Sequence, residues 1–165
     1  KCVRKATDMF LDVHLMVNDP MSQIKFFAEA GADLISFHLE SNSSAVQTLE
    51  LIRSFGVKSA LAIKPGTAAE EVYPLISLCD MVLVMTVEPG YGGQAFIPET
   101  LEKIRQLREY AGGDLDIEVD GGINANTAPL VKEAGANVLV AGTGLFKAED
   151  MAQANAALKA PQKGA

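Results

Sequence analysis

Two side chains of this sequence, His14 and Asp120, are of the types that bind metal ions or transfer protons. Each stands near the carboxyl end of a stretch in which polar and apolar residues alternate, residues 10–17 for the histidine and residues 116–120 for the aspartate. Both lie on the polar face of their stretch. If the carboxyl ends of the two stretches lie side by side in the fold, the two residues could be metal ligands or an acid–base pair. Singly, His14 could be a structural histidine and Asp120 a turn cap, and two ligands do not complete a metal site.

Glycine-rich loops follow three consecutive strand-like stretches. They cover residues 88–94, 120–123 and 141–145. Any one of them could be a tight turn and nothing more. Because glycine allows a backbone to approach a ligand closely, three such loops at the same end of a sheet favour a phosphate-binding site.

Lys64 and two methionines are further candidates for a pocket. Lys64 ends the strand-like residues 59–64 and could be a Schiff-base nucleophile, although we favour pairing with a nearby carboxylate such as Glu40. Met16 and Met85 could line the pocket, although filling the core is the usual role of methionine.

Strand-like and helix-like stretches alternate along the whole chain. Strands are predicted at residues 10–17, 34–40, 59–64, 81–87, 117–120 and 138–141. Helices are predicted at residues 21–30, 44–55, 68–78, 98–110, 126–134 and 149–158. Six βα units of this kind predict a parallel sheet in an α/β protein.

The two faces of the predicted strands favour a barrel over a doubly wound sheet. One face is apolar, whereas the other is polar, and a doubly wound sheet would be apolar on both. The pattern is typical of a (β/α)8 TIM-barrel type fold with its active site at the carboxyl ends of the strands. About six of its eight βα units are present, in one domain of residues 1–158, and residues 159–165 are predicted to be a disordered tail.

Composition excludes several classes of partner. The net charge of −7 and the lack of a basic run argue against nucleic acid, and the longest apolar run, residues 81–87, is too short to cross a membrane. Cys2 and Cys79 have no metal or redox spacing, which predicts free thiols in a reducing compartment and a cytoplasmic protein. Two open sheet edges predict a homo-oligomer.

Six stretches of the sequence resemble the ribulose-phosphate 3-epimerase family. They are residues 12–17, 37–40, 62–67, 84–96, 117–123 and 134–142. The resemblance implies a (β/α)8 barrel that interconverts D-ribulose 5-phosphate and D-xylulose 5-phosphate in the pentose phosphate pathway. It also implies one divalent metal, zinc or iron(II) in the first place and manganese or cobalt as further candidates, held by two His and two Asp.

The resemblance assigns roles to residues of this chain. His14 would be a metal ligand, and Asp120 would be a metal ligand and one of two catalytic carboxylates, with both contacting the pentulose phosphate substrate. Met16 and Met85 would border the reacting carbons. The phosphate end would be held by Gly90, Tyr91, Gly92, Gly93, Gly121, Gly122, Gly142 and Thr143.

The sequence departs from the family pattern in one respect. The family has a substrate-contacting Ser and a His-x-Asp-x-Met-Asp-Gly motif that supplies two metal ligands and the second catalytic Asp, and neither is found here. Asp12 is on the correct strand face but too deep to replace that Asp. We therefore predict an epimerase whose 165 residues alone are inactive or weak. The alternatives are an allulose-6-phosphate 3-epimerase, a Schiff-base aldolase that uses Lys64, and a non-catalytic sugar-phosphate-binding remnant.

Overall fold

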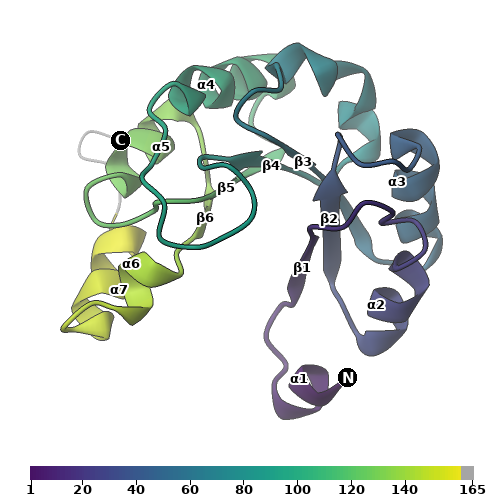
Figure 1. Ribbon diagram of the computed structural model, residues 1–165, viewed down its shortest axis with the longest axis horizontal. Helices are drawn as coiled ribbons and strands as arrows, with labels where there is room; N and C mark the ends of the chain where they lie inside the picture. Colours follow the sequence, from purple (N-terminus) through teal and green to yellow (C-terminus); the bar gives the residue numbers. More distant parts are fainter. Residues whose placement is uncertain (161–165) are drawn as a thin grey trace.

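Six parallel strands form one curled sheet in the computed structural model, which describes residues 1–160 (Figure 1). Each strand pairs with the next in the sequence, in the order β1-β2-β3-β4-β5-β6. Sequential order with parallel pairing is the topology of a barrel built from βα units. The predicted TIM-barrel type with six units is therefore confirmed. The strands are β1 (Asp12–Leu15), β2 (Leu34–His38), β3 (Lys58–Ile63), β4 (Met81–Met85), β5 (Asp116–Asp120) and β6 (Val138–Val140).

Four helices lie along the outer, convex face of this sheet, namely α2 (Ile24–Ala30), α3 (Ala45–Ser54), α4 (Thr100–Ala111) and α5 (Ala128–Ala134) (Figure 1). Helix α1 (Cys2–Ala6) precedes β1, and α6 (Thr143–Phe146) and α7 (Met151–Lys159) follow β6. Within residues 1–160, no helix has the length and apolar character needed to cross a membrane. Residues 161–165 of the predicted disordered tail lie outside the described residues.

One predicted helix, residues 68–78, is instead a pair of short 3-10 helices. These are η1 (Ala69–Glu71) and η2 (Tyr73–Leu78), and Pro74 lies in the first turn of the second. Proline has no backbone N–H and its ring clashes with the carbonyl four residues before it, so a continuous α-helix is excluded here. The connection still packs against α3 and α4, as the predicted helix would.

The main hydrophobic core lies between the sheet and the helices. Alternate strand residues such as Ile35, Phe37 and Leu61 point outward and are completely buried. Each such side chain contributes about 1.5–3 kcal/mol when removed from water. The other strand positions face the inside of the curl, where polar side chains such as Ser36 and Glu118 are buried. The inner face is thus the face on which a site can be built.

Two arginines hold the turns at which α2 and α5 end. Arg4 Nε donates to the carbonyl of Gly31 at 3.0 Å, and Arg108 Nε donates to the carbonyl of Gly135, also at 3.0 Å. Both glycines are left-handed, with φ of 98° and 115°, and a Cβ on either would lie 2.7 Å from its arginine side chain. The repeated Ala-Gly-Ala turn therefore needs glycine for its backbone conformation and for the arginine packed on it.

Replacing Arg108 with Ala is expected to lower the free energy of unfolding by about 1–3 kcal/mol. Besides its bond to the turn after α5, Arg108 donates Nη1 to the carbonyls of Gly112 at 2.6 Å and Leu115 at 2.8 Å. Arg105→Ala on the same helix is the matched control, because its exposed ion pair with Glu102 is worth less than about 1 kcal/mol. Urea unfolding of both variants measures the difference, and equal losses would contradict this role of Arg108.

Candidate active site

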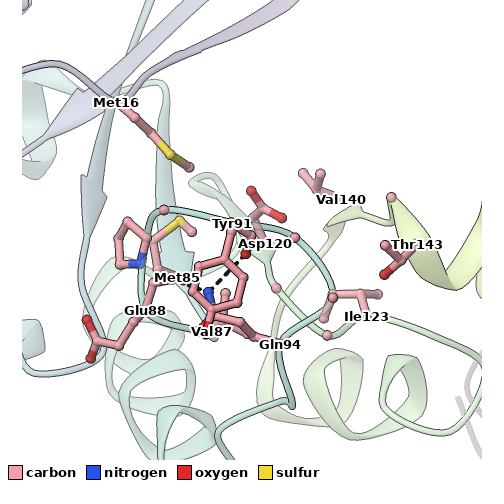
Figure 2. A pocket seen from close by; sticks show the side chains of 17 residues that line it. Met16, Met85, Val87, Glu88, Tyr91, Gln94, Asp120, Ile123, Val140 and Thr143 are labelled. Carbon is pink, nitrogen blue, oxygen red and sulfur yellow. Dashed lines mark hydrogen bonds between the residues drawn. The ribbon is translucent and has the colours of Figure 1, made fainter.

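A cavity of about 220 Å³ opens at the carboxyl ends of β4, β5 and β6. Figure 2 shows Asp120, Met16 and Met85 around it, together with the loops that follow the three strands. His14, in contrast, is not among its lining residues. The predicted phosphate-binding residues that line the cavity are Gly90, Tyr91, Gly92, Gly93, Gly121, Gly122, Gly142 and Thr143.

Close backbone packing explains the glycines after β5. A Cβ at Gly121 would lie 2.5 Å from the Val87 side chain, and a Cβ at Gly122 would lie 2.7 Å from the backbone nitrogen of Phe96. Both glycines have positive φ, 124° and 65°. The loop after β5 therefore packs closely against the loop after β4, and a larger residue at Gly121 or Gly122 would force the two loops apart.

Backbone donors are available at this mouth. Among residues 1–160, no acceptor is found for the N–H groups of Gly121, Gly122, Gly142 and Thr143. On the loop after β4, the Gln94 side-chain amide donates to two carbonyls of its own loop and so holds it folded over the cavity (Figure 2). Free backbone N–H groups on neighbouring loops are the usual means of binding a phosphate without cationic side chains.

Asp120 supplies a carboxyl group to the same cavity. It is the last residue of β5, and burial raises the pKa of its carboxyl above the usual range. A carboxyl group with a raised pKa holds a proton more readily than an ordinary one, which suits a group that must take and return a proton. Glu88 is a second carboxylate among the lining residues, but in Figure 2 its carboxylate points away from Asp120.

Two further carboxyl groups lie on the inner face, deeper than Asp120. Asp12 on β1 and Glu118 on β5 interact with each other, and burial raises the pKa of both carboxyl groups. Burial, the Asp12 carboxyl and the charge of Asp120 together raise the pKa of Glu118 to about 8. Neither residue lines the cavity. Sequence reasoning missed this pair, although the alternation places Glu118 on the face of Asp120.

His14 lies on β1 with an unpaired nitrogen. Its Nδ1 is 2.9 Å from the Ser36 hydroxyl, whereas its Nε2 is buried and has no partner among residues 1–160. Burial and the neighbouring ring of His38 lower the pKa of His14 to about 4, so the ring is neutral at neutral pH. A neutral imidazole with a bare nitrogen is the form that binds a metal ion.

A complete metal site is nevertheless not formed by this part of the chain. In residues 1–160, no group of three or more His, Cys, Asp and Glu side chains is arranged to hold a metal ion. His14 and Asp120 are two ligands at most, whereas a firmly held divalent ion takes at least three protein ligands. The residues present therefore do not fit a self-sufficient metal centre.

The prediction that the Lys64 ammonium pairs with Glu40 is wrong. The contact between the two residues is made by the Lys64 backbone N–H, which donates to Glu40 Oε1 at 2.9 Å. No ion pair joins their side chains in the described part of the chain, and the Lys64 side chain is exposed. A different lysine is buried nearby: Lys103 Nζ donates to the carbonyls of Lys64 at 2.7 Å and Pro65 at 2.9 Å.

The six βα units and the cavity at the carboxyl ends of the strands define a protein of the (β/α)8-barrel type. Solved structures with the same fold include a 3-hexulose-6-phosphate synthase from Salmonella typhimurium, with a TM-score of 0.72 and 18% identity over 95% of this chain and 74% of that one. The tryptophan synthase α-subunit of Pyrococcus furiosus has a TM-score of 0.67 and 20% identity, over 87% of this chain and 60% of that one. These likenesses show the fold alone.

Comparison with known sequences goes further. The family described as the ribulose-phosphate 3 epimerase family matches residues 1–146. Ribulose-phosphate 3-epimerase of Bacillus subtilis is 45% identical over 158 residues, which are 93% of this chain and 73% of the relative. The enzyme of Synechocystis is 44% identical, and the match covers 95% of this chain and 70% of the relative. The enzyme of Eremothecium gossypii is 46% identical, and the match covers 86% of this chain and 59% of the relative. The chain belongs to the ribulose-phosphate 3-epimerase family, whose members are isomerases.

Proposed function

We propose that this chain carries the phosphate-binding part and one acid–base group of a ribulose-phosphate 3-epimerase. The observation that carries the proposal is the cavity in which Asp120 lies beside three glycine-rich loops, two of which carry N–H groups with no acceptor among residues 1–160. The loops would hold the phosphate of D-ribulose 5-phosphate. Met16 and Met85 would pack against the carbon chain and keep water from the reacting carbon.

The reaction asks for two acid–base groups. The ketone acidifies the proton on the neighbouring C3, and Asp120 would remove that proton to leave an enediolate. Inversion then needs a proton delivered to the opposite face of C3, from a group on the other side of the substrate. Within residues 1–160, no second carboxyl group faces Asp120 across the cavity. We therefore expect the chain alone to be inactive or weak in epimerisation.

His14 and Asp120 would be this chain's share of a divalent metal site, with zinc or iron(II) as the first candidates. Such an ion would stabilise negative charge on the enediolate oxygens. Because the described residues do not complete the site, no step is assigned to the metal here. The free Cys2 and Cys79 support a cytoplasmic setting, and the unpaired edges of β1 and β6 support self-association.

An interconversion assay tests the proposed function. The chain alone is compared with a completed protein, in which the part of the Bacillus subtilis relative outside the match is fused to it. We expect the completed protein to interconvert D-ribulose 5-phosphate and D-xylulose 5-phosphate at least 100-fold faster than the chain alone, the lower limit of an acid–base contribution. A completed, folded protein with no turnover would contradict the proposal.

Gly122→Ala is expected to weaken binding of inorganic phosphate to the chain at least tenfold. The added Cβ meets the backbone of Phe96 and demands a positive φ, so the loop after β5 must move away from its neighbour. Gly113→Ala is the matched control, because nothing lies within 4 Å of its Cβ position. Calorimetric titration with phosphate measures both, and an unchanged affinity in Gly122→Ala would contradict phosphate binding at this loop.

A further inference from the structure

A second cavity of about 290 Å³ lies at the carboxyl ends of β1, β2 and β3. Its polar wall includes His38, Glu40, Ser41 and Lys64. Three residues line both cavities, namely Met16, Pro89 and Gly90. The second cavity therefore adjoins the active-site cavity, on the side away from the loops after β5 and β6.

His38 is held in one orientation in the wall of this second cavity. Its Nδ1 lies 3.2 Å from Glu40 Oε2, and the other oxygen of Glu40 accepts from the Lys64 N–H at 2.9 Å and from the Thr67 hydroxyl. Although burial raises it, these hydrogen bonds lower the pKa of Glu40 to about 2, so the carboxylate only accepts. Nδ1 must then carry a proton, and in that tautomer Nε2 can accept a hydrogen bond.

Two polar atoms of this wall are buried without a partner. They are His38 Nε2 and Ser41 Oγ, for which no hydrogen bond is found within residues 1–160. Only 7% of His38 is exposed. Buried polar atoms in native proteins are nearly always paired, so an acceptor and a hydroxyl left unpaired beside one cavity require a polar partner from outside the described residues.

The chemistry of the proposed substrate indicates which of its hydroxyl groups can be the partner of these two atoms. Epimerisation takes place at C3, the phosphate is two carbons away at C5, and the C1 hydroxyl is two carbons away in the other direction. With the phosphate on the glycine-rich loops and C3 at Asp120, the C1 end must extend away from those loops. The second cavity adjoins the first on that side, across Met16 and Gly90.

We propose that the second cavity receives the unphosphorylated end of the ketose phosphate, with His38 Nε2 accepting from, and Ser41 Oγ bonding to, its hydroxyl groups. His38 is then a positioning residue, and Glu40 fixes the tautomer that it needs. The inference rests on the proposed function, because the phosphate must be anchored in the first cavity.

Binding of two ligands to four forms of the chain tests this inference. Calorimetric titrations with D-ribulose 5-phosphate and with inorganic phosphate are made on the parent chain, Ser41→Ala, His38→Asn and His38→Gln. Ser41→Ala and His38→Asn are each expected to weaken binding of the sugar phosphate roughly fivefold to tenfold, the value of one hydrogen bond. Both should leave phosphate affinity within about twofold. His38→Gln keeps an acceptor near the position of Nε2 and should recover most of the loss.

The outcomes separate this inference from the proposed function. Ser41→Ala removes a hydroxyl that makes no hydrogen bond in the described chain, so it carries little risk to folding. If Ser41→Ala and His38→Asn bind the sugar phosphate as tightly as the parent chain and still bind phosphate, the inference about the second cavity is overturned. The proposed function then stands. Equal losses for both ligands show a structural role for His38 and also overturn it. If the parent chain binds neither ligand, the proposed function is contradicted, and the inference that rests on it is overturned with it.

Discussion

Asp120→Asn is expected to slow epimerisation by the completed protein by 10²- to 10⁴-fold, the range of a general acid–base contribution. Asparagine keeps the shape of the side chain and its place at the end of β5, but it cannot take a proton from C3. Phosphate affinity should not fall, because the glycine-rich loops are unchanged and a negative charge has left the cavity. The rate of interconversion of the two pentulose phosphates, followed by NMR, gives the comparison.

Asp116→Asn is the matched control for this experiment. Asp116 begins the same strand and lies at the opposite end of it, where its Oδ1 accepts from the Asn137 side chain at 2.7 Å. Its replacement is expected to leave the rate within about twofold, as for a surface change remote from the chemistry. An Asp120→Asn protein that keeps more than a tenth of the parent rate would remove Asp120 from the proposed mechanism.

Glu118→Gln is expected to stabilise the chain at pH 8 by on the order of 2 kcal/mol. Burial and two neighbouring carboxyl groups raise the pKa of Glu118 from an ordinary 4.5 to about 8. Between these two values the folded chain holds a proton that the unfolded chain has released. The stability that this group contributes is therefore complete below about pH 4.5 and is lost as the pH rises through 8. Glutamine stays neutral over this whole range of pH.

Urea unfolding at pH 5, 6.5 and 8 measures this effect. The gap between Glu118→Gln and the parent chain should be small at pH 5 and should widen steadily towards pH 8. Glu102→Gln, on the exposed face of α4, is the control and should run parallel to the parent chain. Two parallel curves for Glu118→Gln and the parent would show that Glu118 is ionised in the fold throughout this range.

Most of the fold could be predicted from the sequence, because strand alternation is a local signal. The apolar face of residues such as Ile35 and Phe37 and the polar face of Ser36 repeat with a period of two, which fixes both the strand and its orientation. The failure at residues 68–78 has a local cause as well. The prediction ran one helix through Pro74, whereas in the fold the proline prevents a continuous α-helix and two short 3-10 helices form.

The lining of the cavity was predictable where a single loop carries its own signature, and less so where distant residues meet. The glycine-rich loops can be recognised in the sequence, because several glycines at a strand end indicate a backbone that turns sharply or approaches another group closely. The pairing of Asp12 with Glu118 joins strands that are far apart in the sequence, and only the curl of the sheet brings them together. Lys64 shows a further limit, because sequence does not tell whether a residue meets Glu40 through its backbone or its side chain.

Proton exchange at C3 tests the central claim, that this chain holds a phosphate site and one acid–base group. The 165-residue chain is incubated in D2O with D-ribulose 5-phosphate and, separately, with D-xylulose 5-phosphate, and deuterium at C3 is followed by NMR. One group on one face can remove a proton and return a deuteron to the same face. We therefore predict slow deuterium incorporation into one of the two sugars, with little or no conversion into the other. Interconversion as fast as in the completed protein, or no exchange in either sugar under conditions in which phosphate binds, would contradict the account.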